Sequence, residues 1–184
     1  MVERYSKKVC LLGDEGVGKT SLIRRFVENT FDDSYIKTIG TKISKKETVI
    51  QGRDGRPVQL NFMIWDILGH KSSKRVPPTY YAGVEGIMAV FDLTRPETFK
   101  DLDVWVSGIV VEKNYEPAVV ILGNKSDLKD RIKVSEEELK SMAGKMGAAH
   151  FWTSAKTGEN VEAAFHHLGK EMLLRRSGPS WTWA

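Results

Sequence analysis

The sequence is poor in cysteine and contains no long apolar run. Its single cysteine, Cys10, cannot form a disulfide within the chain. No stretch approaches the roughly 18 apolar residues that a membrane-spanning helix needs. Residues 1–8 are polar and lack the apolar centre of a signal peptide. We therefore expect a soluble, cytoplasmic protein in a reducing compartment.

The sequence also has little excess charge. Its 28 Lys and Arg against 24 Asp and Glu give a net charge of +4, too mild a bias to indicate a nucleic-acid partner. Its 184 residues fit one domain, and a hydrophobic fraction of 41% suffices for a core. We expect one domain over residues 1–176, an irregular tail over residues 177–184, and a monomer.

Short apolar runs alternate with stretches of helical character along the chain. The apolar runs predict strands at residues 8–13, 86–92, 117–123 and 149–153, and a hairpin of residues 42–51 and 56–66 around an Asp-Gly turn. Helices are expected at residues 19–28, 97–113, 135–146 and about 159–175. Ser135 and Glu138 form a capping-box pattern. The last helix carries an apolar stripe that we interpret as core: Val161, Phe165, Leu168 and Met172. This alternation predicts an α/β fold with a mostly parallel sheet.

Residues 13–20 match the pattern G-x-x-x-x-G-K-[ST] between a buried strand and a helix. Glycines allow the N–H groups of such a loop to turn inward and hold an anion, and the helix N-terminus adds partial positive charge. Lys19 can neutralise the outer phosphates of a nucleotide, and the Thr20 hydroxyl can bind Mg²⁺. The expected phosphate-binding residues are Asp14, Glu15, Gly16, Val17, Gly18, Lys19, Thr20 and Ser21.

Two further short motifs follow successive strands and indicate which base is bound. They are Asn124-Lys125-Ser126-Asp127 and Ser154-Ala155-Lys156. The Asp127 carboxylate only accepts hydrogen bonds, so it pairs with the N1–H and N2–H donors of guanine and would be repelled by adenine. Asn124 can bond the other edge of the ring, the Ala155 N–H can meet the guanine oxygen, and the lysine stems can cover its faces. Leu128 completes the expected base-binding set: Asn124, Lys125, Asp127, Leu128, Ser154, Ala155 and Lys156.

In order and spacing these motifs resemble those of the Ras-superfamily small GTPases. The similarity covers about residues 7–175, and Tyr35–Gly40, Tyr80-Tyr81 and Thr153–Lys156 look most like the Rab-like branch. The resemblance implies a P-loop G-domain with a six-stranded, mostly parallel sheet, one antiparallel edge strand and five helices. It also implies binding of GTP, GDP and Mg²⁺, and hydrolysis of GTP to GDP and phosphate.

The resemblance assigns roles to further residues. Thr38 would bind Mg²⁺ and the γ-phosphate, Asp66 would hold Mg²⁺ through water, and the Gly69 N–H would meet the γ-phosphate. Phe31 matches the aromatic that packs against guanine, and Tyr35 lies in the same first switch loop. The loops at about residues 31–42 and 66–81 would then report the nucleotide state to effectors, exchange factors and activating proteins.

The second switch motif departs from the family pattern D-T-A-G-Q and reads Asp66-Ile67-Leu68-Gly69-His70. His70 replaces the glutamine that orients the attacking water. One hypothesis gives His70 that catalytic role, beside Lys19, Thr38 and Gly69, because a neutral imidazole accepts a hydrogen bond from water. The other is that His70 is only tolerated and that intrinsic hydrolysis is very slow.

Other departures also leave alternatives open. Ile67 and Leu68 either crowd the γ-phosphate or pack on the core. The Glu15 carboxylate either repels the γ-phosphate and obstructs an incoming arginine, or points to solvent. The basic residues that follow His70 supply an arginine-type finger or form a solvated face; they are Lys71, Lys74 and Arg75.

Many relatives end in a prenylated cysteine, but this sequence has none after Cys10. We therefore expect no lipid anchor and at most peripheral membrane contact. Besides the GTP-hydrolysing switch, two functions compete: a nucleotide-binding scaffold with little hydrolysis, which the Asp66–His70 motif favours, and an unrelated P-loop kinase or ATPase, which Asn124–Asp127 disfavours.

Overall fold

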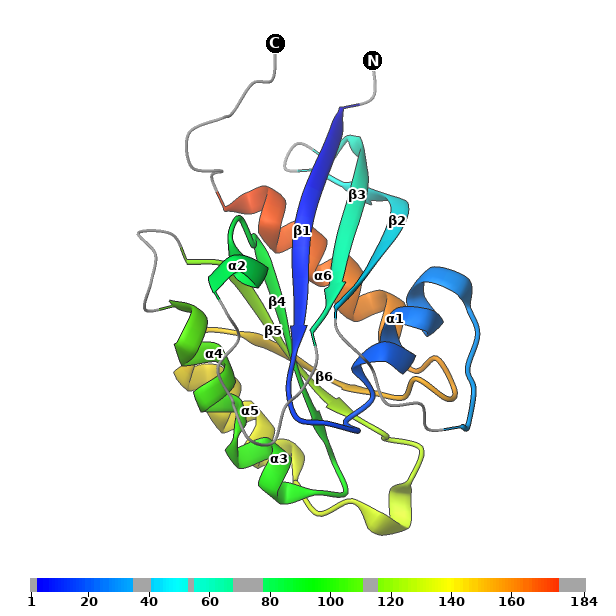
Figure 1. Cartoon of the computed structure of the whole chain (residues 1–184), viewed down its shortest axis with the longest axis vertical. Coiled ribbons are helices and arrows are strands. Elements are labelled where there is room, and N and C mark those ends of the chain that lie inside the picture. The colour runs from blue at the N-terminus through cyan, green and yellow to red at the C-terminus, as the bar shows by residue number, and fades with distance from the viewer. Residues whose placement is uncertain (1–2, 35–40, 53–54, 68–77, 111–115, 176–184) are drawn as a thin grey trace.

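The structure, a computed structural model, describes residues 3–34, 41–52, 55–67, 78–110 and 116–175 (Figure 1). One six-stranded sheet runs through these ranges in the order β2-β3-β1-β4-β5-β6. The strands are β1 (Arg4–Leu12), β2 (Lys42–Gln51), β3 (Pro57–Asp66), β4 (Gly86–Asp92), β5 (Ala118–Asn124) and β6 (Ala149–Thr153). Only the pairing of β2 with β3 is antiparallel, so the predicted α/β sheet with one antiparallel edge strand is confirmed.

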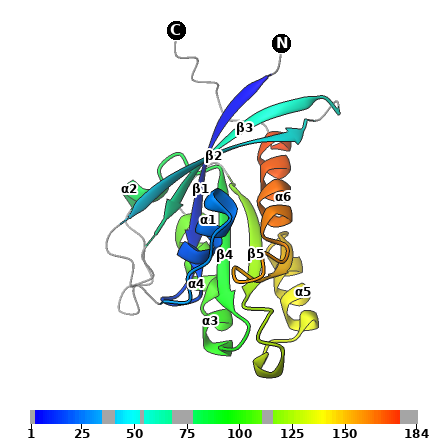
Figure 2. The same ribbon diagram turned by 90° about the vertical axis from the view of Figure 1, so that its right-hand side faces the viewer.

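Helices cover both faces of the sheet (Figures 1 and 2). They are α1 (Lys19–Glu28), α2 (Pro78–Tyr81), α3 (Pro96–Lys100), α4 (Leu102–Val110), α5 (Glu136–Lys145) and α6 (Val161–Leu174), with a 3₁₀ turn at Lys129–Arg131. Up to residue 110, the single helix expected at residues 97–113 is present as α3 and α4, which meet at Asp101; residues 111–113 lie outside the described ranges. If α3 and α4 are counted as one helix, the described ranges contain the five helices that the resemblance implies. No helix of the described ranges is both long and apolar enough to cross a bilayer.

The core is formed by apolar side chains that recur at strand or helix spacing in the sequence. In β3 the side chains of Val58, Leu60, Phe62 and Ile64 are buried, and the residues between them are half-exposed, as expected for a strand with one covered face. The stripe of α6 is buried against this face as predicted, and Phe165 stacks on Phe26 of α1 with ring centroids 3.9 Å apart. The Ser135–Glu138 capping box is also confirmed.

The first strand is longer than the apolar run predicts, because it begins at Arg4 rather than Lys8. Its polar start pairs in parallel register with β3, from Arg4 opposite Gln59 to Lys7 opposite Phe62. The side chain of Lys7 is only 5% exposed, and its Nζ lies 2.5 Å from Oε1 of Glu85, the residue before β4. This ion pair lets a charged residue occupy an inward-facing position.

Replacing Lys7 with methionine is expected to lower the free energy of unfolding by about 2 kcal/mol. The change removes the cationic partner of the Glu85 carboxylate. The cost stays below that of a fully buried pair because Glu85 is 24% exposed and still accepts from the Lys8 N–H at 3.4 Å. Urea unfolding of the two proteins measures the difference. The double variant Lys7→Met, Glu85→Leu should regain most of the loss, and equal losses in the single and double variants would contradict this account.

Candidate functional site

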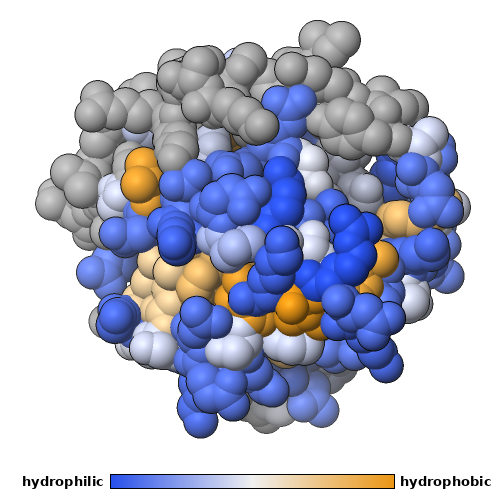
Figure 3. Space-filling view, turned by 90° about the horizontal axis from the view of Figure 1, so that it is seen from below, coloured by the Kyte–Doolittle hydropathy of each residue, from blue (hydrophilic) through white to orange (hydrophobic). Residues whose placement is uncertain are grey.

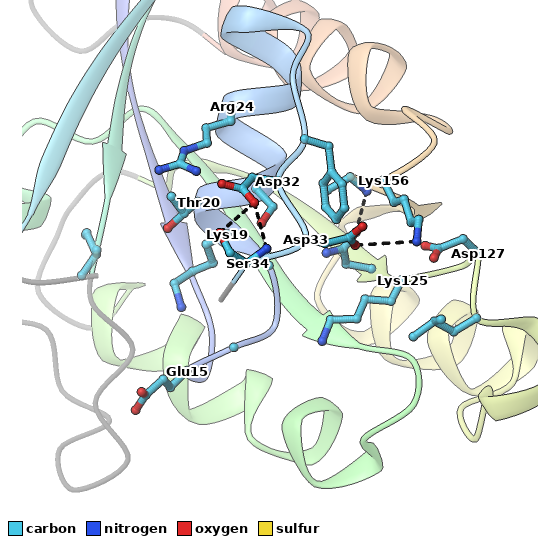
Figure 4. Close-up of a pocket in the computed structure, with 18 residues that line it drawn as sticks. Glu15, Lys19, Thr20, Arg24, Asp32, Asp33, Ser34, Lys125, Asp127 and Lys156 are labelled. Atoms are coloured by element: carbon cyan, nitrogen blue, oxygen red, sulfur yellow. Dashed lines mark hydrogen bonds and ion pairs between the residues drawn. The ribbon is translucent and has the colours of Figure 1, made fainter. Parts of the chain in front are cut away.

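A cleft of about 300 Å³ opens at the carboxyl end of the sheet. It lies where β1, β5 and β6 run into the loops that carry the three motifs, which is where open α/β sheets bind ligands. Seen from this end, the molecule is mainly hydrophilic around a smaller hydrophobic area (Figure 3). In the close-up, Lys19 and Thr20 lie at one side of the cleft, and Lys125, Asp127 and Lys156 lie at the other (Figure 4).

The phosphate loop has the backbone that its glycines predict. Gly13, Gly16 and Gly18 have φ angles of +137°, +75° and +102°, a region that L side chains rarely adopt. A Cβ on Gly13 would lie 2.0 Å from the carbonyl oxygen of Val90, so β4 also excludes a side chain there. Helix α1 begins at Lys19, so its N-terminal N–H groups would face an anion bound at the loop.

Lys19 is folded into this loop and is 7% exposed. Its Nζ donates to the carbonyl oxygens of Gly13 at 2.7 Å and Asp14 at 2.9 Å. Burial lowers its pKa from 10.5 to about 8, and the negative charge of Asp66 opposes that shift. The ammonium group is thus a cation with little solvation of its own, which a phosphate would compensate.

Thr20 and Asp66 come together from α1 and the end of β3. The Thr20 Oγ1 donates to Oδ2 of Asp66 at 2.5 Å. Burial raises the pKa of Asp66, and its Oδ1 is a buried oxygen without a hydrogen-bond partner in the described ranges. A hydroxyl and an unsatisfied carboxylate oxygen suit Mg²⁺ that also binds phosphate. Within the described ranges no cluster of three acidic, His or Cys residues offers an all-protein metal site.

Asn124 joins the loops around the cleft. Its Nδ2 donates to the carbonyl oxygen of Val17 at 2.9 Å, and its Oδ1 accepts from Thr153 Oγ1 and from the Ala155 N–H, both at 3.3 Å. The side chain is 1% exposed. The amide therefore fixes the phosphate loop relative to β6. Its expected contact with the base stays a prediction, as does the contact of the Ala155 N–H with the guanine oxygen.

Replacing Asn124 with alanine is expected to lower the free energy of unfolding by about 3 kcal/mol even without nucleotide. The change removes the hydrogen bonds that Asn124 makes to the buried Val17 carbonyl and to the Ala155 N–H. Denaturant unfolding of nucleotide-stripped protein measures this. A residue that only contacted the base would change nucleotide affinity and leave the stability of the stripped protein as it was.

The base end of the cleft is set by Asp127 and two lysines. Ser154 Oγ donates to Oδ1 of Asp127 at 2.6 Å, which fixes the carboxylate and leaves its other oxygen for a ligand. Lys156 lies 3.6 Å from Asp33, and Lys125 lies 2.7 Å from Asp92 at the end of β4. Lys125 has a φ of +72°, which places it at a strained corner of the loop. An anchored acceptor between lysine stems matches the donor edge of guanine.

Comparisons with known proteins show the family to which the chain belongs. A model of the Ras family matches residues 8–174. The chain belongs to the Ras family. It is 35% identical over 171 residues to the Ras-related protein Rab-13 of Mesocricetus auratus, an alignment that covers 93% of this chain and 82% of the relative. Rab-13 of Bos taurus is also 35% identical, and that of Canis lupus familiaris 34%, over the same shares of the two chains. The protein is therefore a Rab-like small GTP-binding switch protein, in a family of GTPases that bind guanine nucleotide and Mg²⁺.

As expected for a Ras-family protein, most of the predicted ligand residues line the one cleft. These are Glu15, Gly16, Gly18, Lys19, Thr20, Ser21, Phe31, Asn124, Lys125, Asp127, Leu128, Ala155 and Lys156. Four other predicted residues in the described ranges are not part of the lining. Val17 is buried in the core, Asp14 accepts from the indole N–H of Trp105 at 2.8 Å, Ser154 donates to Asp127, and Asp66 accepts from Thr20.

Several predicted residues lie outside the described ranges. These are Tyr35, Thr38, Leu68, Gly69, His70, Lys71, Lys74 and Arg75, together with the tail at residues 177–184. Ile67 is described and is 5% exposed, packed with Cys10, Leu12 and Tyr81. The interpretation that Ile67 packs on the core is therefore confirmed for this residue, although it also lines the cleft.

Sequence reasoning missed Arg24, Asp32, Asp33 and Ser34 in the lining of the cleft. A signal existed for Arg24, because it follows Thr20 by four positions on α1 and so shares its face. Ser34 donates through its N–H and its hydroxyl to Asp32, a local turn that the sequence also allows. Asp33 pairs with Lys156, which is far away in the sequence, and no local pattern reveals this contact.

Proposed function

We propose that this Ras-family protein hydrolyses GTP to GDP and phosphate with Mg²⁺, and that its loops at about residues 31–42 and 66–81 report the bound nucleotide to effectors. The observation that carries the proposal is the meeting of three groups at one cleft: the buried Lys19 of the phosphate loop, Thr20 with its bond to Asp66 beside the lining, and the anchored Asp127. Together they match a guanine base at one end and charged phosphates at the other.

The chemistry rests on positioning and on neutralising charge. Lys19 and the loop N–H groups would hold the phosphates and stabilise the charge that develops on the leaving oxygen. Thr20 and Asp66 would hold Mg²⁺, which supplies further neutralisation when bound. Thr38 and Gly69 would contact the γ-phosphate, so its loss would release both switch loops. Exchange factors and activating proteins would act through those loops.

His70 would orient the attacking water.

The second candidate function, a nucleotide-binding scaffold with little hydrolysis, is favoured by one specific observation. Ile67, next to Asp66, is a large apolar residue in the lining of the cleft, and Glu15 of the phosphate loop belongs to the same lining. Both would face the reacting phosphate end rather than the base end, so either could slow hydrolysis without weakening guanine recognition.

Two measurements on the purified protein test the proposal. Chromatography of heat-released nucleotide should show GDP or GTP, and ATP displacing bound GDP would contradict it. Single-turnover hydrolysis of bound GTP should then proceed with Mg²⁺ and slow at least tenfold in His70→Ala. An unchanged rate would remove the catalytic role of His70, and no turnover in the unaltered protein, with or without cell extract, would favour the scaffold.

Glu15→Gly should raise the rate of GTP hydrolysis or its response to an activating protein.

A further inference from the structure

Arg95 lies just before α3 and reaches back to the phosphate loop. Its Nη2 donates to the carbonyl oxygen of Glu15 at 3.0 Å, across 80 residues of sequence. Its Nε donates to Oδ2 of Asp92 at 3.1 Å. Arg95 does not line the cleft, whereas Glu15 and Gly16 do. The guanidinium group therefore binds the phosphate loop from outside the cleft.

The contact with a carbonyl has a consequence for the next N–H. The peptide bond between Glu15 and Gly16 is trans, because the described ranges contain no cis peptide, so its C=O and N–H point in opposite directions. With the carbonyl turned to Arg95, the N–H of Gly16 turns away from Arg95, and Gly16 lines the cleft whereas Arg95 does not. Gly16 has a φ of +75°, a conformation that glycine enters and leaves easily, and an external anchor would hold it there.

Asp92 makes this anchor rigid and connects it to the base end. Its side chain is 2% exposed and accepts from Arg95, from Lys125 at 2.7 Å, and from the N–H and hydroxyl of Thr94. Burial opposes ionisation of Asp92, but the bonds from Lys125 and Thr94 hold its pKa below the usual value. One buried carboxylate thus fixes both the arginine behind the phosphate loop and the lysine of the base loop.

We propose that Arg95 is a positioning residue for polyphosphate binding, which acts by orienting the Gly16 N–H through the Glu15 carbonyl. The inference rests on the proposed function, since it assumes a guanine nucleotide in the cleft. It differs from an ordinary surface ion pair, which contributes little, because the second acceptor is a backbone carbonyl of the ligand-binding loop. A charge-assisted bond of this kind is about twice as strong as a neutral one.

The test compares the dissociation of a fluorescent GDP analogue from the unaltered protein and from Arg95→Met. Methionine keeps an unbranched stem, ends two atoms short of the guanidinium Nη atoms and has no donors, and we expect dissociation to be about tenfold faster. Arg95→Lys should show a smaller, few-fold acceleration, because one ammonium group replaces a fork that spans two acceptors. Arg131→Ala is the matched control, since Arg131 is an exposed arginine in the 3₁₀ turn at the same end of the sheet, and it should dissociate at the original rate.

Two further readouts separate positioning from general loosening. The ratio of GDP to IDP affinity reports on Asp127, since inosine lacks the exocyclic amino group of guanine. This ratio should not change in Arg95→Met. The amide proton signal of Gly16 should lose most of its shift on GDP binding in this variant, while the Lys19 amide keeps its shift.

An original dissociation rate in Arg95→Met, or a GDP to IDP ratio that collapses, would overturn the proposal. If Arg95→Met were unstable, Arg95→Lys would decide the question, and dissociation at the original rate would count against the role. Failure of the unaltered protein to bind any guanine nucleotide would instead overturn the proposed function.

Discussion

Asp127→Asn is expected to weaken GDP binding by about 10³-fold. Asparagine can keep its oxygen on the Ser154 hydroxyl, which donates to Asp127 at 2.6 Å, and its NH₂ group would then face the N1–H and N2–H donors of guanine. The asparagine NH₂ and the guanine N–H groups are all donors, so they would repel each other where the Asp127 carboxylate accepts. Isothermal titration of nucleotide-stripped protein with GDP measures the loss.

The same substitution should improve binding of xanthosine diphosphate, because xanthine carries an oxygen where guanine carries its amino group. This gain separates a change of specificity from damage to the fold. Ser154→Ala serves as the control: it frees the carboxylate without changing its acceptors, so a loss of about tenfold is expected. If Asp127→Asn weakened both nucleotides equally, the donor–acceptor account of base selection would be wrong.

Gly13→Ala is expected to destabilise the fold by about 4 kcal/mol or more. The added Cβ would lie 2.0 Å from the carbonyl oxygen of Val90, which belongs to the centre of the sheet and cannot rotate away as a side chain would. The φ of +137° adds strain for any L side chain. The melting temperature and the nucleotide content of the purified variant measure the effect.

Gly83→Ala is the matched control for this prediction. Gly83 also has a positive φ, +72°, but nothing lies within 4 Å of an added Cβ. It should therefore cost only the conformational strain, about 1–2 kcal/mol. Similar losses in the two variants would show that backbone conformation, and not the collision with β4, makes glycine necessary at position 13.

Much of the fold was predictable because its signals are local. The alternation in β3, the buried run of β4, the stripe of α6 and the Ser135–Glu138 cap each depend on residues within one element, and all four are present. The ends of elements were less predictable. The polar residues 4–7 join β1 only because β3 offers them hydrogen-bond partners, which the sequence of β1 does not disclose.

Much of the candidate site was predictable for a similar reason. A glycine pattern before a lysine requires particular φ angles, and a carboxylate at the end of a buried strand selects for a donor edge, so residues 13–20 and Asp127 could be named from sequence. The departures at Glu15 and Ile67 were also visible. Of the two, the packing of Ile67 against Cys10 and Tyr81 needed the assembled core.

The sequence by itself therefore determined the order of strands and helices, the phosphate loop, and the preference for guanine, since each follows from backbone angles, periodicity or donor chemistry within a few residues. Only the tertiary structure decided how these loops are held. Arg95 meets Glu15, and Arg25 donates to the carbonyls of Ala155 and Lys156, across 80, 130 and 131 residues. Such contacts arise when the packing of distant elements brings a long side chain to a backbone carbonyl, and no spacing along the chain records that approach.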